Sequence, residues 1–291
     1  MRVTGNHLIE LTTAATARQQ GKLASAAEQV TSGLRVTSPS DDPSAWLTAQ
    51  RAKLQRTVAA GASVAVQASR DRLDETDGAL STIGDAVSQV RALAIQANTG
   101  TLSASDRAAL VDQVRGLQAL ALGAANRRDV NGEYLFAGAN ALSAPFDAAG
   151  AYAGDGAVRQ VPDGLAGLAA TTIPGSALTA AHGVDVLPLF GRIADALAAN
   201  DTAALAAALP DLTTAVGQVA EARSRTGSTM AVLDGTLRAH GALADSLTTA
   251  IARAVEVDTV AAAGDLAKTS QALEVSRAVS AHVISLLSPS T

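Results

Sequence analysis

Apolar residues between Leu80 and Ala97 recur at alternating intervals of three and four, the pattern of a helix that packs along a continuous seam. A second seam of the same kind follows at Leu110, Val114, Leu117, Ala121 and Ala124. Between the two, Gly100 suits a C-terminal cap, and Ser103 with Asp106 fits a capping box at the start of the second helix. The two segments are predicted to form an antiparallel helical hairpin.

Composition favours long, thin helical packing over a deep globular core. The chain of 291 residues is 48% hydrophobic, but only 2% of its residues are aromatic, and alanine is abundant. Alanine is the best helix former and allows helices to approach closely. Cysteine is absent, which excludes a disulfide scaffold and cysteine-ligated metals.

Two further helices are predicted before the first seam. The first should end near Gly33, because residues 38–43 contain two prolines that disfavour helix in the residue before each of them. Asp42 can cap the next helix, and Pro43 suits its first position. That helix should continue through the apolar positions Leu47, Leu54 and Val58 toward Leu73.

The middle of the chain differs in composition from the helical segments on either side. Tyr134, Phe136, Phe146 and Tyr152 are four of the six aromatic residues, and glycine-containing turns punctuate the sequence as far as residue 183. These features predict short strands and hairpins over a small local aromatic core.

Helix is predicted again in the C-terminal part. One helix should run from Val186 to about Ala199, and Asn200-Asp201 should cap the next one. A turn or kink is expected at Pro210, and the chain should be helical from Leu212 nearly to Leu287.

The resulting fold class is mainly α with a small β element, in which the N- and C-terminal arms form long antiparallel coiled-coil helices. We expect a terminal helical inner domain (1–40 with 250–291), a helical rod domain (41–137 with 186–249) and a β- and turn-rich insert (138–185) packed on the rod. The terminal arms bury mostly small side chains, so we expect them to order fully only against each other and against neighbouring subunits.

No catalytic, cofactor-binding or metal-binding site is predicted. The four histidines have no second ligand at i+3 or i+4, and no nucleophile elbow or phosphate loop is present. Acidic residues 71–77 lie beside Arg70 and Arg72, which indicates a solvated helix face. The chain is therefore not expected to be an enzyme.

Binding to nucleic acid and insertion into a membrane are also not expected. The formal net charge is -5 without a run of like charges. The most apolar stretch, 203–209, is far shorter than the roughly 20 residues that span a bilayer. The N-terminus lacks a signal-peptide core, so any export should use a route without a cleavable leader.

Several short motifs, in this order and spacing, resemble the bacterial flagellin superfamily. They are Gln29–Arg35 (QVTSGLR), Ser40-Asp41-Asp42-Pro43, Arg91–Asn98 (RALAIQAN), Gly100-Thr101 and Asp106-Arg107, followed by the looser Glu221-Ala222-Arg223 with Gly227, and Val257-Asp258 through Ser285-Leu286-Leu287. The resemblance implies an axial structural subunit that is exported unfolded by the flagellar type III apparatus and lies outside the cell.

The middle of the chain resembles the branch of this superfamily that joins hook to filament. This part of the resemblance lies in residues 131–138 (NGEYLFAG), Pro145-Phe146 and residues 152–155 (YAGD). It implies a homo-oligomer that contacts the first hook-associated protein, flagellin and a flagellar export chaperone. The family motifs assign structural roles to Asp41, Asp42, Pro43, Arg91, Asn98, Asn131, Gly132, Tyr134, Phe136, Tyr152 and Asp155. The alternatives are a minimal filament flagellin and a coiled-coil adaptor.

A hypothesis for assembly follows from the apolar faces of the two arms. We expect the face with Leu8, Leu11, Leu23, Val30 and Leu34 to pack against the face with Leu266, Leu273, Val283 and Leu287. A helical symmetry operator could then repeat this packing into a tube.

Overall fold

The computed structural model describes residues 2–99, 102–162 and 168–287. Within them the fold is mainly helical with one small sheet, which confirms the expected fold class. The helices are α1 (Arg2–Ser32), α2 (Pro43–Ala97), α3 (Ala104–Ala125), α4 (Val186–Ala198), α5 (Thr202–Val255) and α6 (Thr259–Leu287). Strands β1 (Gln160–Pro162) and β2 (Leu168–Ala170) pair antiparallel, and two short 3-10 turns, Gly175–Leu178 and Ala180–His182, precede α4.

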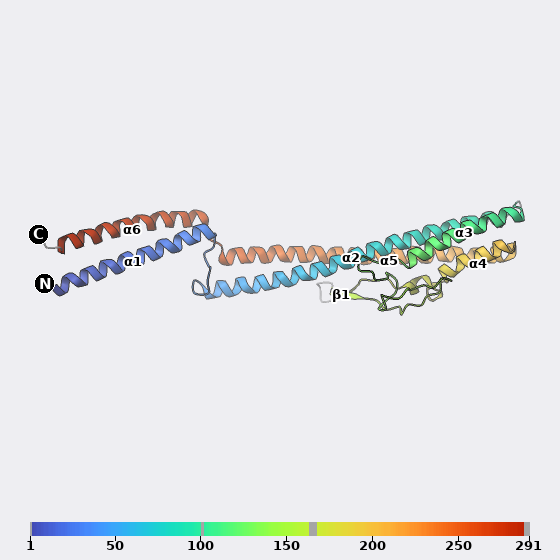
Figure 1. Cartoon of the computed structure of the whole chain (residues 1–291), viewed down its shortest axis with the longest axis horizontal. Helices are drawn as coiled ribbons and strands as arrows, with labels where there is room; N and C mark the ends of the chain where they lie inside the picture. Colours follow the sequence, from blue (N-terminus) through green and yellow to red (C-terminus); the bar gives the residue numbers. More distant parts are fainter. Residues whose placement is uncertain (1, 100–101, 163–167, 288–291) are drawn as a thin grey trace. The chain divides into compact units, whose positions relative to one another are not determined.

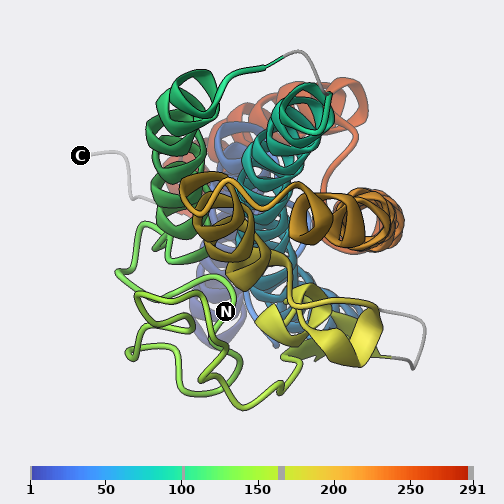
Figure 2. The ribbon, with the colours of Figure 1, turned by 90° about the vertical axis from the view of Figure 1, so that its right-hand side faces the viewer.

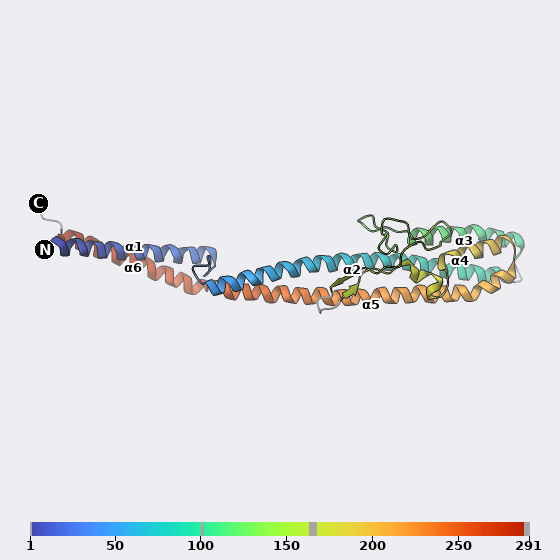
Figure 3. The same ribbon diagram turned by 90° about the horizontal axis from the view of Figure 1, so that it is seen from below.

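The chain divides into two compact units, Met1–Ala59 with Leu243–Thr291 and Ala60–Ala242. In the first unit α1 and α6 pack side by side (Figures 1 and 3). Near the start of α6 the chain pairs across a β-bridge between Leu34 and Glu256, where the Arg35 backbone N–H donates to Val255 O at 2.7 Å. Val36, Ala49 and Val255 form a small buried cluster beside this bridge.

The second unit holds most of the hydrophobic core. Figure 2 shows its helices nearly end-on, with the irregular segment that follows α3 running along one side. All six residues of the first predicted seam, from Leu80 to Ala97, are completely buried, and Leu110, Val114 and Ala121 of the second seam join the same cluster. Helix α4 adds eight buried residues, among them Phe190 and Ile193.

The predicted helix ends are largely confirmed. Ser103 and Asp106 form a capping box at the start of α3, while Gly100 lies outside the described residues. Asp42 Oδ1 accepts from the backbone N–H of Ala45 at 3.0 Å at the start of α2. Asp201 Oδ1 accepts from the N–H of Ala204 at 2.9 Å at the start of α5.

Of the turn or kink expected at Pro210, the turn is absent, because Pro210 lies inside α5. The buried residues Leu205 and Leu212 on either side hold this helix against the core. The chain is also not helical throughout from Leu212, since α5 ends at Val255 and α6 begins at Thr259. Asp258 caps the new helix by accepting from the N–H groups of Val260 and Ala261.

The insert is less regular than expected. Its described residues contain the β1–β2 hairpin, with Gln160 opposite Ala170, and isolated bridges such as Phe146 to Tyr152. The aromatic side chains do not form a separate local core, because Phe136 and Phe146 are buried in the same cluster as the helices of the second unit. The three-domain division proposed from the sequence remains a prediction.

Among the described residues one helix, α5, is long and apolar enough to cross a membrane by length and composition, with a mean hydropathy of 1.2 in its most apolar window. Of that window 28% is buried, and Leu205, Leu212, Ala215 and Val219 of this helix belong to the core of the second unit.

Candidate assembly surface and motif residues

The terminal arms contact each other along one shared interface. The hydroxyl of Thr16 lies 3.0 Å from that of Ser276 and 3.1 Å from that of Ser280, so α1 and α6 approach closely through small polar side chains. Leu273 is buried in this unit. Of the other residues expected on the two faces, Leu23, Val30, Leu34, Leu266 and Val283 are half-buried, Leu8 and Leu11 are exposed, and the side chain of Leu287 is outside the described set.

Several large apolar side chains of the first unit remain exposed. They follow helical spacing on two elements, with Leu47, Leu54 and Val58 on α2 and Val275, Val279 and Leu286 on α6. Intervals of four and seven place each set along one face of its helix. Together with Leu8 and Leu11, these residues supply apolar area that a neighbouring protein can bury.

Asp41 organises the loop between α1 and α2. Its Oδ2 accepts from the backbone N–H groups of Thr37 at 3.0 Å and Ser38 at 2.8 Å. These hydrogen bonds, with that of Ser38 the stronger cause, hold the pKa of Asp41 below its ordinary value. The motif residue thus fixes the backbone of a turn.

Asp42 and Pro43 start α2, and Asp42 also links the loop to α5. The Asp42 carboxylate lies 3.3 Å from the guanidinium of Arg35, which in turn donates to Ala254 O at 2.9 Å near the end of α5. The hydrogen bond from the Ala45 N–H is the main reason why the pKa of Asp42 is lowered. The motif that ends at Arg35 and the Asp-Asp-Pro motif therefore meet at one junction.

Arg91 is exposed on α2, and Asn98 follows the end of that helix, where its backbone N–H donates to Ala94 O at 3.0 Å. This hydrogen bond involves only the backbone of Asn98, and its side-chain role stays a prediction. The structure gives no packing role to Arg91.

Residues 131–136 form a tight turn that enters the core. Gly132 has a positive φ of 79°. The hydroxyl of Tyr134 accepts from Arg128 Nη2 at 2.8 Å, and the Arg128 guanidinium lies 4.3 Å from the centre of the Tyr134 ring. Asn131 is exposed, whereas Phe136 is buried.

The motif at residues 152–155 is a set of interlocking contacts. Asp155 Oδ1 accepts from the backbone N–H groups of Ala139 and Ala157, both at 3.0 Å. A Cβ at Gly138 would lie 1.9 Å from that oxygen, and a Cβ at Gly154 would lie 2.3 Å from the Tyr152 hydroxyl. Both glycines are therefore required by close approach, and the backbone hydrogen bonds, chiefly from Ala157, lower the pKa of Asp155.

A buried charge cluster was missed in the sequence. The side chain of Arg72 is only 9% exposed, and its Nη1 pairs with Asp129 and with Glu133, the latter at 3.2 Å. Glu133 also pairs with Arg159 at 2.6 Å. The prediction of a solvated face was therefore wrong for Arg72. Its partners are more than 50 residues away, so the local charge pattern contained no signal for this contact.

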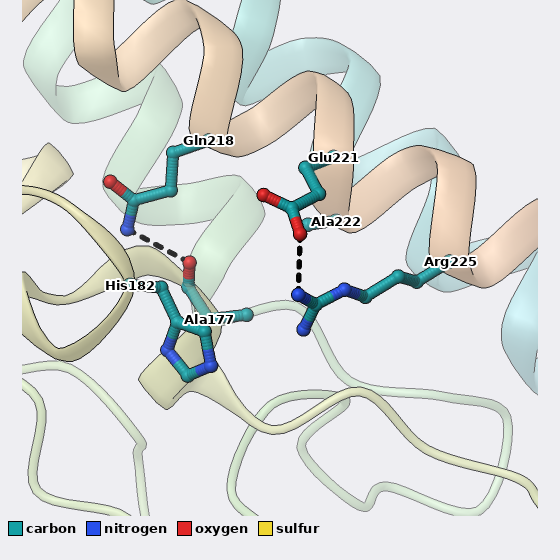
Figure 4. A pocket seen from close by; sticks show the side chains of 6 residues that line it. All are labelled: Ala177, His182, Gln218, Glu221, Ala222 and Arg225. Carbon is teal, nitrogen blue, oxygen red and sulfur yellow. Dashed lines mark hydrogen bonds and ion pairs between the residues drawn. The ribbon is translucent and has the colours of Figure 1, made fainter.

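One cavity among the described residues lies beside α5. This cavity, drawn in Figure 4 and lined by Ala177, His182, Gln218, Glu221, Ala222 and Arg225, holds about 10 Å³, the size of one water molecule. Its charged residues, Glu221 and Arg225, pair with each other one turn apart on α5. No group of three or more histidine or acidic side chains among the described residues could hold a metal ion.

Comparison with known proteins supports this helical arrangement. Residues 6–141 match the family described as bacterial flagellin N-terminal helical region. Flagellar hook-associated protein 3 of Salmonella typhimurium is 31% identical over 167 residues, which cover 56% of this chain and 52% of the relative. Both matches relate the chain to flagellins and to hook-associated protein 3 over about half of its length.

The matches to hook-associated protein 3 extend over more of the chain than the match to flagellin. The Escherichia coli protein of that name is 35% identical over 121 residues, covering 41% of this chain and 38% of the relative. The flagellin of Escherichia coli is 34% identical over 104 residues and is covered to only 20% of its length. The chain spans about half the length of the Salmonella relative and a smaller share of the length of the two Escherichia coli proteins.

Solved structures show the same fold. The crystal structure of FlgL from Xanthomonas campestris superimposes with a TM-score of 0.61 at 20% identity, covering 70% of this chain and 99% of that one. The flagellar junction protein FlgL from Legionella pneumophila gives a TM-score of 0.59 at 15% identity, covering 72% of this chain and all of that one. The names of these relatives and neighbours denote flagellar proteins.

Proposed function

We propose that this chain is a structural subunit of the bacterial flagellum that joins the hook to the filament. The single observation that carries the proposal is the extent of the match, which covers 56% of this chain and 52% of hook-associated protein 3 but only 34% of this chain and 20% of flagellin. The exposed apolar faces of α1, α2 and α6 supply surfaces for contacts with other subunits.

The same proposal names partners and location. The subunit forms a homo-oligomer outside the cell after export by the flagellar type III apparatus with the help of an export chaperone. It contacts the first hook-associated protein on one axial side and flagellin on the other. A chain without cysteine or a buried cofactor site suits this route, because nothing has to be oxidised or loaded after folding.

Deletion of the gene in its own bacterium tests the function. Electron microscopy should show hooks without filaments, and flagellin should accumulate in the culture medium. Loss of filaments with no released flagellin would support the alternative, a minimal filament flagellin. Intact, attached filaments would contradict both, and complementation with the intact gene is the control.

A substitution in the arms tests the assembly faces. Leu273→Asp places a charge in the buried contact with α1, at a cost of several kcal/mol if the carboxylate stays buried. We expect the variant to be exported but not assembled. Val260→Asp, at an exposed position of the same helix, is the matched control and should assemble normally. Normal assembly of Leu273→Asp would contradict the proposed faces.

A further inference from the structure

The loop after α3 presents two apolar side chains to solvent. Val130 is 91% exposed and Leu142 is 78% exposed. They flank one small ladder, in which Leu135 donates to Arg127 O at 3.0 Å and Tyr134 donates to Ala141 O at 2.8 Å. We call Val130 and Leu142 the knob. The ladder holds both residues in place, so the knob is ordered before it meets a partner.

A groove lies between α2 and α3 in the same unit. Its volume is about 550 Å³, and its surface is mostly apolar because Ala92, Leu93, Leu117 and Leu120 line it, with Gln89, Gln113 and Gly116 completing the lining. Leu120 is 53% exposed although it is a large apolar residue. The groove is large enough for side chains such as those of the knob.

The charges beside the two features are complementary. Arg127 and Arg128 precede the knob and are exposed. On α2, Asp85 lies four residues before Gln89 and eight before Leu93, so it is on the same side of the helix as these groove residues. On α3, Asp112 has the same spacing to Gly116 and Leu120.

The basic residues of the two groove helices lie elsewhere. Arg91 is two positions from both Gln89 and Leu93, and Arg115 is two positions from both Gln113 and Leu117. Residues two apart on a helix do not share a face. Each edge of the groove therefore carries one carboxylate, with Asp85 near Arg223 and Asp112 three residues before Arg115, and the knob has basic neighbours.

We propose that the knob of one copy of this chain docks into the groove of a neighbouring copy. The two surfaces are different patches of one unit, so the contact is heterologous and can repeat from copy to copy. The apolar side chains exclude water at the centre, while the Arg127 side chain faces the carboxylates of the rim. The proposal rests on the proposed function only in requiring that copies be neighbours in the flagellum.

Disulfide cross-linking can test the contact, because the chain has no cysteine of its own. The variants Val130→Cys and Leu120→Cys are expressed together in the deletion strain, and isolated flagella are mildly oxidised. Disulfide-linked peptides are then identified by mass spectrometry. We expect the linkage between positions 130 and 120 to exceed homodimers of either variant.

The matched control pairs Val130→Cys with Val232→Cys, a residue of α5 that is 51% exposed, close to the exposure of Leu120. Equal yields of the 130–120 and 130–232 linkages would overturn the proposal. So would the presence of both variants in attached flagella without the 130–120 linkage, an outcome that leaves the junction function standing. Absence of the chain from isolated flagella would instead overturn the proposed function, and the docking with it.

Charge reversal supplies a second test. Asp112→Arg in the Leu120→Cys chain should lower the yield of the 130–120 linkage about threefold to fivefold, the effect of one rim charge pair. Arg127→Asp in the Val130→Cys chain should then restore it. A yield that charge reversal does not change would contradict the proposed orientation of the two surfaces.

Discussion

Gly138 and Asp155 show how individual residues fix the insert. The Asp155 carboxylate occupies the space that a side chain at residue 138 would need, and it ties residues 139 and 157 together through their backbone N–H groups. Asp41 does the same for the loop before α2. At this scale the carboxylates of the family motifs fix the loops by accepting hydrogen bonds from backbone N–H groups.

Gly138→Ala should therefore destabilise the protein. Its φ of +76° alone disfavours alanine by about 1–3 kcal/mol, and the contact with Asp155 adds to this. Denaturant unfolding of the full chain measures the effect. Gly78→Ala is the control, since nothing lies near its Cβ position within α2, and it should be neutral or stabilising by up to about 1 kcal/mol. Equal behaviour of the two variants would contradict the close approach.

The loop carboxylates should also make stability depend on pH. Asp41, Asp42, Asp106 and Asp155 all have a pKa lowered by hydrogen bonds in the folded state. A lowered folded pKa gives stability that is present above the unfolded value near 3.8 and is lost as pH falls through the folded value. We expect the denaturation midpoint to fall steeply below about pH 4.

Asp155→Asn isolates one of these contributions. The variant should be less stable at pH 7 and should lose less stability on acidification than the parent. Asp112→Asn, on an exposed face of α3, should follow the parent curve. An unchanged acid profile in Asp155→Asn would mean that this carboxylate does not contribute.

At the scale of elements, one charge cluster connects α2 to the segment that follows α3 and, through the pair of Glu133 with Arg159, to the insert. Arg72 of α2 pairs with Asp129 and Glu133 and donates to Tyr134 O at 2.8 Å, so three residues of the segment after α3 depend on one side chain. The Asp129 side chain is only 6% exposed. By contrast Arg223, which pairs with Asp77 at 3.0 Å between α5 and α2, is 43% exposed.

Arg72→Met should cost about 3–5 kcal/mol, because it leaves the Asp129 carboxylate buried without its cation. Arg223→Met should cost about 1 kcal/mol or less, since solvent screens an exposed pair. Denaturant unfolding of both variants gives the comparison. Similar losses in the two variants would show that the Arg72 cluster does not hold the insert in place.

At the scale of the whole molecule, the two units have very different cores. The second unit buries large side chains from α2, α3, α4 and α5, including Phe136, Phe190 and Ile193. In the first unit the buried cluster beside the β-bridge consists of Val36, Ala49 and Val255. Apolar burial scales with stability, so the first unit should open more easily than the second.

Hydrogen exchange of the full-length monomer tests this difference. Backbone amides of α4 should exchange slowly, and those of α1 and α6 should exchange much faster. Assembled flagella should protect α1 and α6, because neighbouring copies then cover the exposed apolar faces. Equal protection of α1 and α4 in the monomer would contradict the expectation that the arms order fully only on assembly.

Local patterns in the sequence were enough to predict the helices and their caps, and short motifs indicated the likeness to flagellins. Heptad spacing and capping chemistry are local, so Leu80 to Ala97, Ser103 with Asp106 and Asp42 with Pro43 could be interpreted without knowing what lies nearby. The tertiary structure was needed to show that Arg72 pairs with Asp129 and that α5 continues through Pro210. It was also needed to show that Phe136 and Phe146 belong to the core formed by the helices. Those outcomes depend on contacts between residues far apart in the chain, whose free energies no local pattern encodes.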